Sequence, residues 1–101
     1  MPNLVSISRK GGDKNVVVHP NHIDNEICAH FKIEPHPKWY VCGWWDTVGY
    51  SMKGSFSEIA DMYREGDEGE SERTKQFRGY TVQILEFLDQ NFVLSASYSA
   101  F

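Results

Sequence analysis

The stretch EICAHFKIEPHPKWYVCGWW, residues 26–45, decides the fold that the sequence predicts. Apolar side chains occupy every second position of its first half: Ile27, Ala29, Phe31 and Ile33. The residues between them are cysteine, histidine, lysine and glutamate. Strict alternation of this kind is typical of a β-strand with one buried face. The pattern therefore predicts a strand over residues 26–34.

The same segment also has the spacing of a helix. Ile23, Ile27 and Phe31 are four residues apart, like one apolar face of a helix, and Asn21 is a suitable N-cap. The alternation is longer, because it runs through eight residues without a break. We therefore expect the strand, preceded by a short turn or helical segment at residues 21–25.

A second strand is expected after a sharp break in the chain. Pro35 and Pro37 cannot donate to a sheet ladder, so the chain should reverse there. Residues 38–45 are rich in strand-forming residues. We expect a hairpin in which Glu34 lies opposite Lys38. One face of this hairpin then carries Cys28, His30, Tyr40, Cys42 and Trp44. The other face carries apolar core residues, namely Ile27, Phe31, Trp39 and Trp45.

Further strands are expected near both ends of the chain and before the helices. Residues 4–8 alternate, and a turn with two glycines separates them from the valine-rich residues 15–19, which predicts a hairpin. Residues 48–53 and 93–98 have the composition of additional strands. The expected strands therefore come from the first half of the chain and from its C-terminal end.

Two helices are expected in the second half of the chain. Ser55 and Glu58 form a capping-box pattern, in which the serine oxygen accepts an N–H of the first helical turn. This helix should end at Gly66, because glycine readily adopts the left-handed conformation at a helix end. A longer helix is expected over residues 73–91, with an apolar stripe that faces the core: Phe77, Tyr80, Thr81, Ile84, Leu85 and Leu88.

The elements together predict an α+β fold: a small antiparallel sheet of about four to five strands with two C-terminal helices packed on one face. A length of 101 residues suits one core, so residues 1–101 should form a single compact domain. No apolar run is long enough to span a membrane. Two cysteines are too few for a disulfide framework, and the N-terminus lacks a secretory signal. A cytoplasmic location is expected, in the host cytoplasm if a phage encodes the chain.

The charge is unevenly distributed along the chain. The formal net charge is −4, but residues 57–72 alone carry −6 and the other residues together +2. The chain lacks the basic stripe that grips phosphates, so direct binding of nucleic acid is disfavoured. An acidic surface suits a basic partner protein. Arg73, Lys75 and Arg78 follow the acidic residues, and we expect the acidic loop to fold back onto them.

The cysteines and histidines are the candidate groups for chemistry. Cys28, His30 and Cys42 share one face of the predicted hairpin, with His22 upstream, and these ligand types suit zinc. Their spacing lacks the paired ligands of zinc sites, so we expect no metal and no cofactor. Cysteine beside histidine also suits nucleophilic catalysis, but no orienting third group or oxyanion hole is evident. The sequence therefore does not predict an enzyme.

Protein binding is the predicted function. We expect a small acidic inhibitor that covers the basic surface of a nucleic-acid-binding protein, as phage and mobile-element anti-defence proteins do, the anti-CRISPR and anti-restriction proteins among them. The alternatives are an immunity protein or antitoxin that neutralises a nuclease toxin, and a small zinc-binding or thiol enzyme. A second copy of the chain is a further candidate partner. The predicted partner-binding residues are Tyr40, Trp44, Glu65, Asp67, Glu68, Glu70 and Glu72. The competing interpretation is that these acidic residues only solvate the surface.

Overall fold

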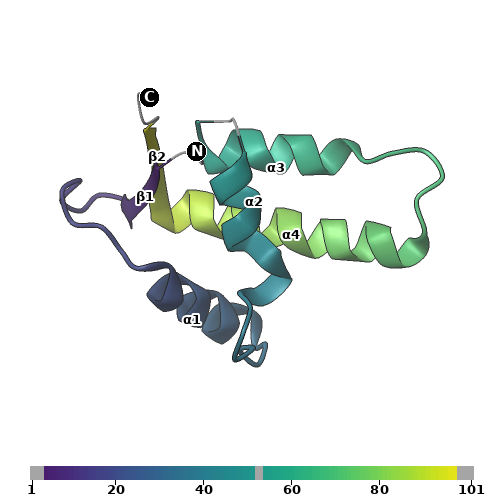
Figure 1. The fold of residues 1–101 in the computed structure, drawn as a ribbon, viewed down its shortest axis with the longest axis horizontal. Helices are drawn as coiled ribbons and strands as arrows, with labels where there is room; N and C mark the ends of the chain where they lie inside the picture. Colours follow the sequence, from purple (N-terminus) through teal and green to yellow (C-terminus); the bar gives the residue numbers. More distant parts are fainter. Residues whose placement is uncertain (1–3, 52–53, 98–101) are drawn as a thin grey trace.

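The computed structural model describes residues 4–51 and 54–97. In chain order its elements are β1 (Leu4–Arg9), α1 (Pro20–Phe31), the 3-10 helix η1 (Val41–Gly43), α2 (Trp44–Tyr50), α3 (Phe56–Glu65), α4 (Glu72–Asn91) and β2 (Phe92–Ser97). The fold of these residues is mainly helical, with one two-stranded antiparallel sheet (Figure 1). The predicted α+β fold with a sheet of four to five strands is therefore wrong.

The strand predicted over residues 26–34 is instead the end of helix α1 and the turn after it. Ile23 and Ile27 are completely buried on one face of the helix. Ala29 is exposed and Ile33 is 39% exposed, although the alternation placed both in the core. The apolar spacing of four therefore outweighs the spacing of two, because a helix satisfies its backbone hydrogen bonds without a partner strand.

Helix α1 begins earlier than the short helical segment that the sequence predicted. His19 is its N-cap, and the Nδ1 atom of His19 accepts the N–H of Asn21 at 3.1 Å. Pro20 takes the first helical position, where the absence of its N–H leaves no hydrogen bond unmade. Pro20 thus starts a helix directly after residues 15–19, which were predicted as a strand.

The second predicted strand, residues 38–45, is a loop followed by η1 and the start of α2. Cys42 and Gly43 have left-handed backbone conformations, with φ of 54° and 60°, which a strand does not accommodate. The predicted hairpin therefore does not form, and neither of its faces exists. The core tryptophan is Trp44 rather than Trp39, which is 67% exposed.

The two-stranded sheet joins segments from opposite ends of the chain. β1 pairs with β2, so that Ile7 lies opposite Leu94, and not with residues 15–19 as predicted. The N–H of Val18 donates to the carbonyl of Ile7 at 2.7 Å. This is the one backbone hydrogen bond between the two predicted N-terminal strands that the described residues contain.

The two remaining predicted strands have different outcomes. The strand expected over residues 93–98 is confirmed as β2, although Tyr98 lies outside the described residues. Of the strand expected over residues 48–53, the first three residues belong to helix α2, and residues 52–53 lie outside the described ranges. The expected sheet thus loses all but its outermost strands.

Both predicted C-terminal helices are confirmed. Ser55 caps α3, and its Oγ atom accepts the N–H of Glu58 at 3.2 Å. The helix ends before Gly66, which has φ of 62°. α4 runs antiparallel to α3, and the two form the most extensive helix pair of the fold (Figure 1). The predicted stripe of α4 is buried only in its second half. Phe77 and Tyr80, in the first half, are each 56% exposed.

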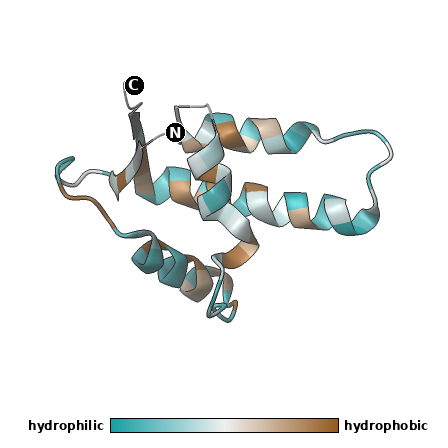
Figure 2. Cartoon of the chain, in the orientation of Figure 1, coloured by the Kyte–Doolittle hydropathy of each residue, from teal (hydrophilic) through white to brown (hydrophobic). Residues whose placement is uncertain are grey.

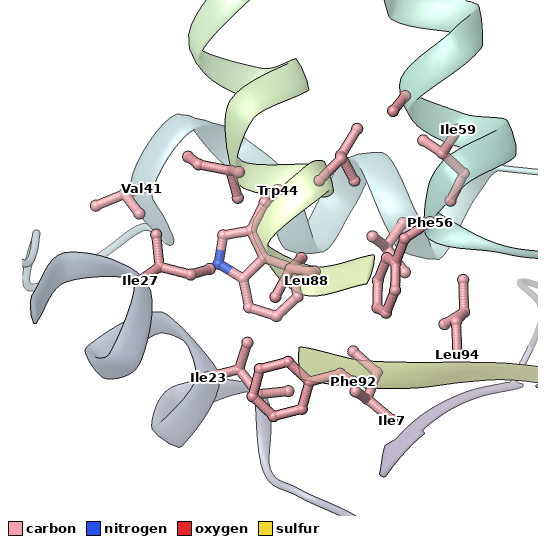
Figure 3. Packing of buried hydrophobic residues seen from close by; sticks show 14 of the residues in the cluster. Ile7, Ile23, Ile27, Val41, Trp44, Phe56, Ile59, Leu88, Phe92 and Leu94 are labelled. Atoms are coloured by element: carbon pink, nitrogen blue, oxygen red, sulfur yellow. The ribbon is translucent and has the colours of Figure 1, made fainter. Parts of the chain in front are cut away.

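The core is one cluster to which every helix and both strands contribute. Trp44 has no exposed surface, and Figure 3 shows its indole ring among Ile23, Ile27 and Leu88. Phe56 and Phe92 are buried in the same cluster, with Phe56 on the side of Ile59 and Leu94. Burial of a side chain of this size stabilises the fold by about 2–3 kcal/mol. Trp44 therefore ties the N-terminal helix to the C-terminal helical pair.

Candidate functional site

The acidic loop between α3 and α4 is held in place by Arg78. The Nε and Nη2 atoms of Arg78 donate to Oε2 of Glu70 at 3.1 and 3.0 Å. Its Nη1 atom donates to the carbonyl oxygens of Tyr63 and Arg64 at 2.9 and 3.1 Å. One guanidinium thus fixes the loop and caps the end of α3. The predicted attraction between the acidic loop and the start of α4 is confirmed at Arg78.

Glu70 stabilises the acidic loop from within. Its side chain is only 9% exposed, and it accepts the backbone N–H of Asp67 as well as the Arg78 bonds. The Asp67 hydrogen bond, and after it the Arg78 bond, lower the pKa of Glu70 from its ordinary value of 4.5. The charge of Glu70 is therefore compensated within the chain. Glu72 is exposed, and its carboxylate lies 3.5 Å from Nζ of Lys75.

Three predicted site residues of this region keep unpaired charges. Glu65, Asp67 and Glu68 are exposed, and within the described parts of the chain none of them forms an ion pair with lysine, arginine or histidine. Glu65 is the last residue of α3, and Asp67 and Glu68 lie on the loop that follows it. This loop is at the end of the α3–α4 pair and is predominantly hydrophilic (Figure 2). The fold therefore presents three carboxylates, one at the end of α3 and two on the loop whose shape Arg78 fixes.

Two clefts lie along α3 beside this loop. The first has a volume of about 340 Å³, lies between α2 and α3, and is lined by Asp46, Thr47, Tyr50, Ser51, Ile59, Met62 and Tyr63. The second has a volume of about 310 Å³, lies at the acidic loop, and shares Met62 and Tyr63 with the first. We term the first cleft the α2–α3 groove. Helices α3 and α4 form a helical hairpin, and the acidic loop is its tip. We term the α2–α3 groove together with Glu65, Asp67 and Glu68 the hairpin surface.

The two predicted aromatic site residues lie elsewhere. Trp44 is in the core and has no exposed surface. Tyr40 is half-buried, and its hydroxyl donates to Oδ1 of Asn21 at 2.9 Å. Tyr40 lines a separate cleft of about 390 Å³ between α1 and residues 35–40. The structure therefore does not bring either aromatic to the acidic loop.

The cleft beside Tyr40 is lined by a loop with internal hydrogen bonds from His36. Nδ1 of His36 accepts the backbone N–H groups of Lys38 and Trp39 at 3.0 and 3.3 Å. The imidazole of His36 also lies tilted against the ring of Trp39, with centroids 4.4 Å apart and an interplanar angle of 34°. Because Nδ1 already accepts two hydrogen bonds, this atom is not free to act as a general base.

Asp24 fixes the chain directly after this loop, at the start of η1 and of α2. It is 6% exposed, and its Oδ1 atom accepts the backbone N–H of Val41 and the indole N–H of Trp44, both at 2.9 Å. The thiol of Cys28 lies 4.0 Å from Oδ2. A buried carboxylate is costly unless hydrogen bonds compensate it, and these donors do so. Asp24 therefore belongs to the fold rather than to a catalytic centre.

The two cysteines are thiols without an activating environment. Both are free, Cys28 is buried and Cys42 is half-buried. Burial, and after it the charge of Asp24, raises the pKa of each thiol above its ordinary value of 9.0. A nucleophilic cysteine requires the opposite shift. The thiol-enzyme alternative therefore receives no support from the electrostatics of this region.

The side chains that were weighed as zinc ligands do not come together as a metal site within the described residues. His22 and His30 are exposed on α1, and the ring of His30 stacks on Phe87 with centroids 4.4 Å apart. Over residues 4–51 and 54–97 there is no group of three or more histidine, cysteine, aspartate or glutamate side chains that suits a metal ion. The shared face that the predicted hairpin gave Cys28, His30 and Cys42 does not exist.

The residues of the α2–α3 groove were not predicted from the sequence. Asp46 and Tyr50 are one helical turn apart, and they share a groove with Met62 only because α2 is a helix that packs beside α3. As part of a strand, residues 48–53 gave no reason to connect Tyr50 with the acidic loop. The spacing of four between Asp46 and Tyr50 was the available signal.

Comparison of the chain with protein-family models, with curated proteins and with solved structures gives no match. None of the helices within the described ranges is both long and apolar enough to cross a membrane. The function is therefore inferred from the surface itself.

Proposed function

We propose that the protein binds a basic surface of another protein through the hairpin surface. The observation that carries this proposal is the fixed acidic loop, in which Arg78 and Glu70 set the backbone while neighbouring carboxylates stay exposed and unpaired. A loop that is ordered before binding loses little conformational entropy on binding. Opposite charges on the partner also accelerate the encounter at low salt.

The proposed target is a nucleic-acid-binding protein or a nuclease. Such proteins carry lysine and arginine side chains that meet phosphates, and carboxylates that occupy these side chains exclude the nucleic acid. Two forms of this inhibition are proposed: an anti-defence protein of a phage or mobile element, directed at a CRISPR or restriction system, and an immunity protein directed at a nuclease toxin. The identity of the captured target distinguishes them. A cytoplasmic location, where thiols stay reduced, belongs to the same proposal.

Two other partner classes fit the surface less well. Nucleic acid would bring phosphates against Glu65, Asp67 and Glu68, and like charges repel. A symmetric homodimer through the hairpin surface would bring the two acidic loops, which carry the same charge, into one interface. Of the three partner classes, a basic protein is the one that the exposed carboxylates of this surface attract.

The experiment compares two double variants with the same change in net charge. Asp67→Lys/Glu68→Lys reverses two exposed carboxylates of the acidic loop. Asp13→Lys/Glu34→Lys reverses two exposed carboxylates outside the α3–α4 pair and serves as the control. Partners are captured with the wild-type protein, and the affinity of each variant for the purified partner is then measured by calorimetry.

The expected result is a loss of at least about tenfold in affinity for the loop variant and a change within about twofold for the control. Circular dichroism should show the same helix content in all three proteins. Equal affinities of the two variants would overturn the proposal, because the effect would then follow net charge rather than position.

A further inference from the structure

We infer that the α2–α3 groove takes an arginine side chain of the partner, with its guanidinium between the carboxylate of Asp46 and the ring of Tyr50. This inference rests on the proposed function and names the chemistry of one contact within it. It assigns a role to Asp46, Tyr50 and Met62, none of which belongs to the acidic loop.

The groove combines a charge with exposed apolar surface. Asp46 is the one charged residue of its lining among the described residues, and it forms no ion pair within the described ranges. Tyr50 is 79% exposed and Met62 is 49% exposed, so a tyrosine ring and a thioether face solvent beside the carboxylate. An occupant with a cationic head and an apolar stem matches both features.

The groove also continues into the acidic loop. Met62 and Tyr63 line both the groove and the cleft at Glu65, Gly66 and Asp67. A basic segment attracted by the loop therefore passes over Met62 on its way to Asp46. The hydroxyl of Tyr63 lies 3.5 Å from Oγ1 of Thr47, a contact that links α3 to α2 across the floor of the groove.

Arginine fits this groove better than lysine. A guanidinium is planar, so it stacks on a tyrosine ring while its edge forms two parallel hydrogen bonds with a carboxylate. The ammonium of lysine is a compact and strongly hydrated charge that does not combine these two contacts as well. A preference for arginine is thus the signature that separates the groove from a general attraction between opposite charges.

The test is a nuclear magnetic resonance titration of the whole chain with two defined probes, a blocked tetra-arginine peptide and a blocked tetra-lysine peptide. The wild-type protein is compared with Asp46→Asn, with Tyr50→Ala and with the control Glu34→Gln, which neutralises an exposed carboxylate remote from the groove. Asp46 and Tyr50 are both exposed at the surface of α2, so these variants should keep the fold, which their amide spectra report directly.

The expected result is a cluster of shift changes at α2 and at Met62 that is larger for the arginine peptide, with binding about threefold tighter than for the lysine peptide. Asp46→Asn and Tyr50→Ala should each abolish this preference, and Glu34→Gln should retain it. Shift changes confined to residues 65–72 would overturn the inference and leave the proposed function standing. Equal binding of the two peptides, or no binding of either, would also overturn the inference.

Discussion

At the scale of single residues, Asp24 and Arg78 organise most of what the surface presents. Asp24 fixes Val41 and Trp44, and thereby directs the chain from the loop into α2. Arg78 fixes the acidic loop and the end of α3. The sequence marks Arg78 through the acidic residues that precede it. Nothing in the sequence marks Asp24, because its partners lie 17 and 20 residues further along the chain.

Asp24→Ala should destabilise the fold strongly. The substitution leaves two buried donors, the backbone N–H of Val41 and the indole N–H of Trp44, without an acceptor, at a cost of about 3 kcal/mol in unfolding free energy. Asp24→Asn keeps an acceptor oxygen and should cost clearly less. Urea denaturation followed by tryptophan fluorescence measures both. Equal losses for the two variants would show that the hydrogen bonds to Oδ1 are not what matters.

The stability of the acidic loop should depend on pH through Glu70. Its pKa is lowered in the folded state, so its contribution to stability is present above the ordinary value of 4.5 and is lost as the pH falls through the lowered pKa. Glu70→Gln should therefore be less stable than the wild type at pH 7, and the difference should shrink towards pH 3. Thermal unfolding at a series of pH values tests this. A difference that is constant with pH would contradict the assigned role.

At the scale of elements, local sequence signals determine α3 and α4, whereas tertiary contacts determine the structure of the segment that contains α1. The Ser55 cap, Gly66 and the stripe of α4 are local signals, and both helices were predicted from them. Residues 23–34 carry two competing periodicities, and only the burial of Ile23 and Ile27 against Trp44 decides between them. The acidic loop of the proposed binding surface lies between these two helices, so its position follows from the same local signals, whereas the α2–α3 groove depends on α2 being a helix.

The junction of α3 with the acidic loop should tolerate no side chain at Gly66. Gly66 has φ of 62° and ψ of 176°, and a Cβ there would overlap with Nη2 of Arg78. Gly69 also has a positive φ, 80°, but a Cβ there meets nothing within 4 Å. Gly66→Ala should therefore cost about 2 kcal/mol or more, and the matched Gly69→Ala about 1 kcal/mol.

A double-variant cycle separates backbone strain from the contact with Arg78. In the Arg78→Ala background the clash is gone, so Gly66→Ala should cost less than in the wild type, while the cost of Gly69→Ala should stay the same. Urea denaturation of the six proteins supplies the free energies. A cost of Gly66→Ala that does not change in the Arg78→Ala background would assign the whole effect to the backbone.

At the scale of the whole molecule, one core supports two separate surfaces. The α3–α4 pair carries the acidic loop at its end, away from the sheet, and the loop of residues 35–40 lies beside α1 (Figure 1). The overall acidity and the region that carries it could be predicted from the sequence. Which carboxylates stay free could not, because Glu70 is paired and Glu65, Asp67 and Glu68 are not.

Hydrogen–deuterium exchange of the protein, alone and bound to its captured partner, tests the central claim most directly, since it reports every segment of the surface in one measurement. The hairpin surface predicts slower exchange on binding in residues 44–50 and 59–70, with residues 35–40 unchanged. Protection of residues 35–40, with 59–70 unchanged, would contradict the account and move the binding site to the cleft beside Tyr40.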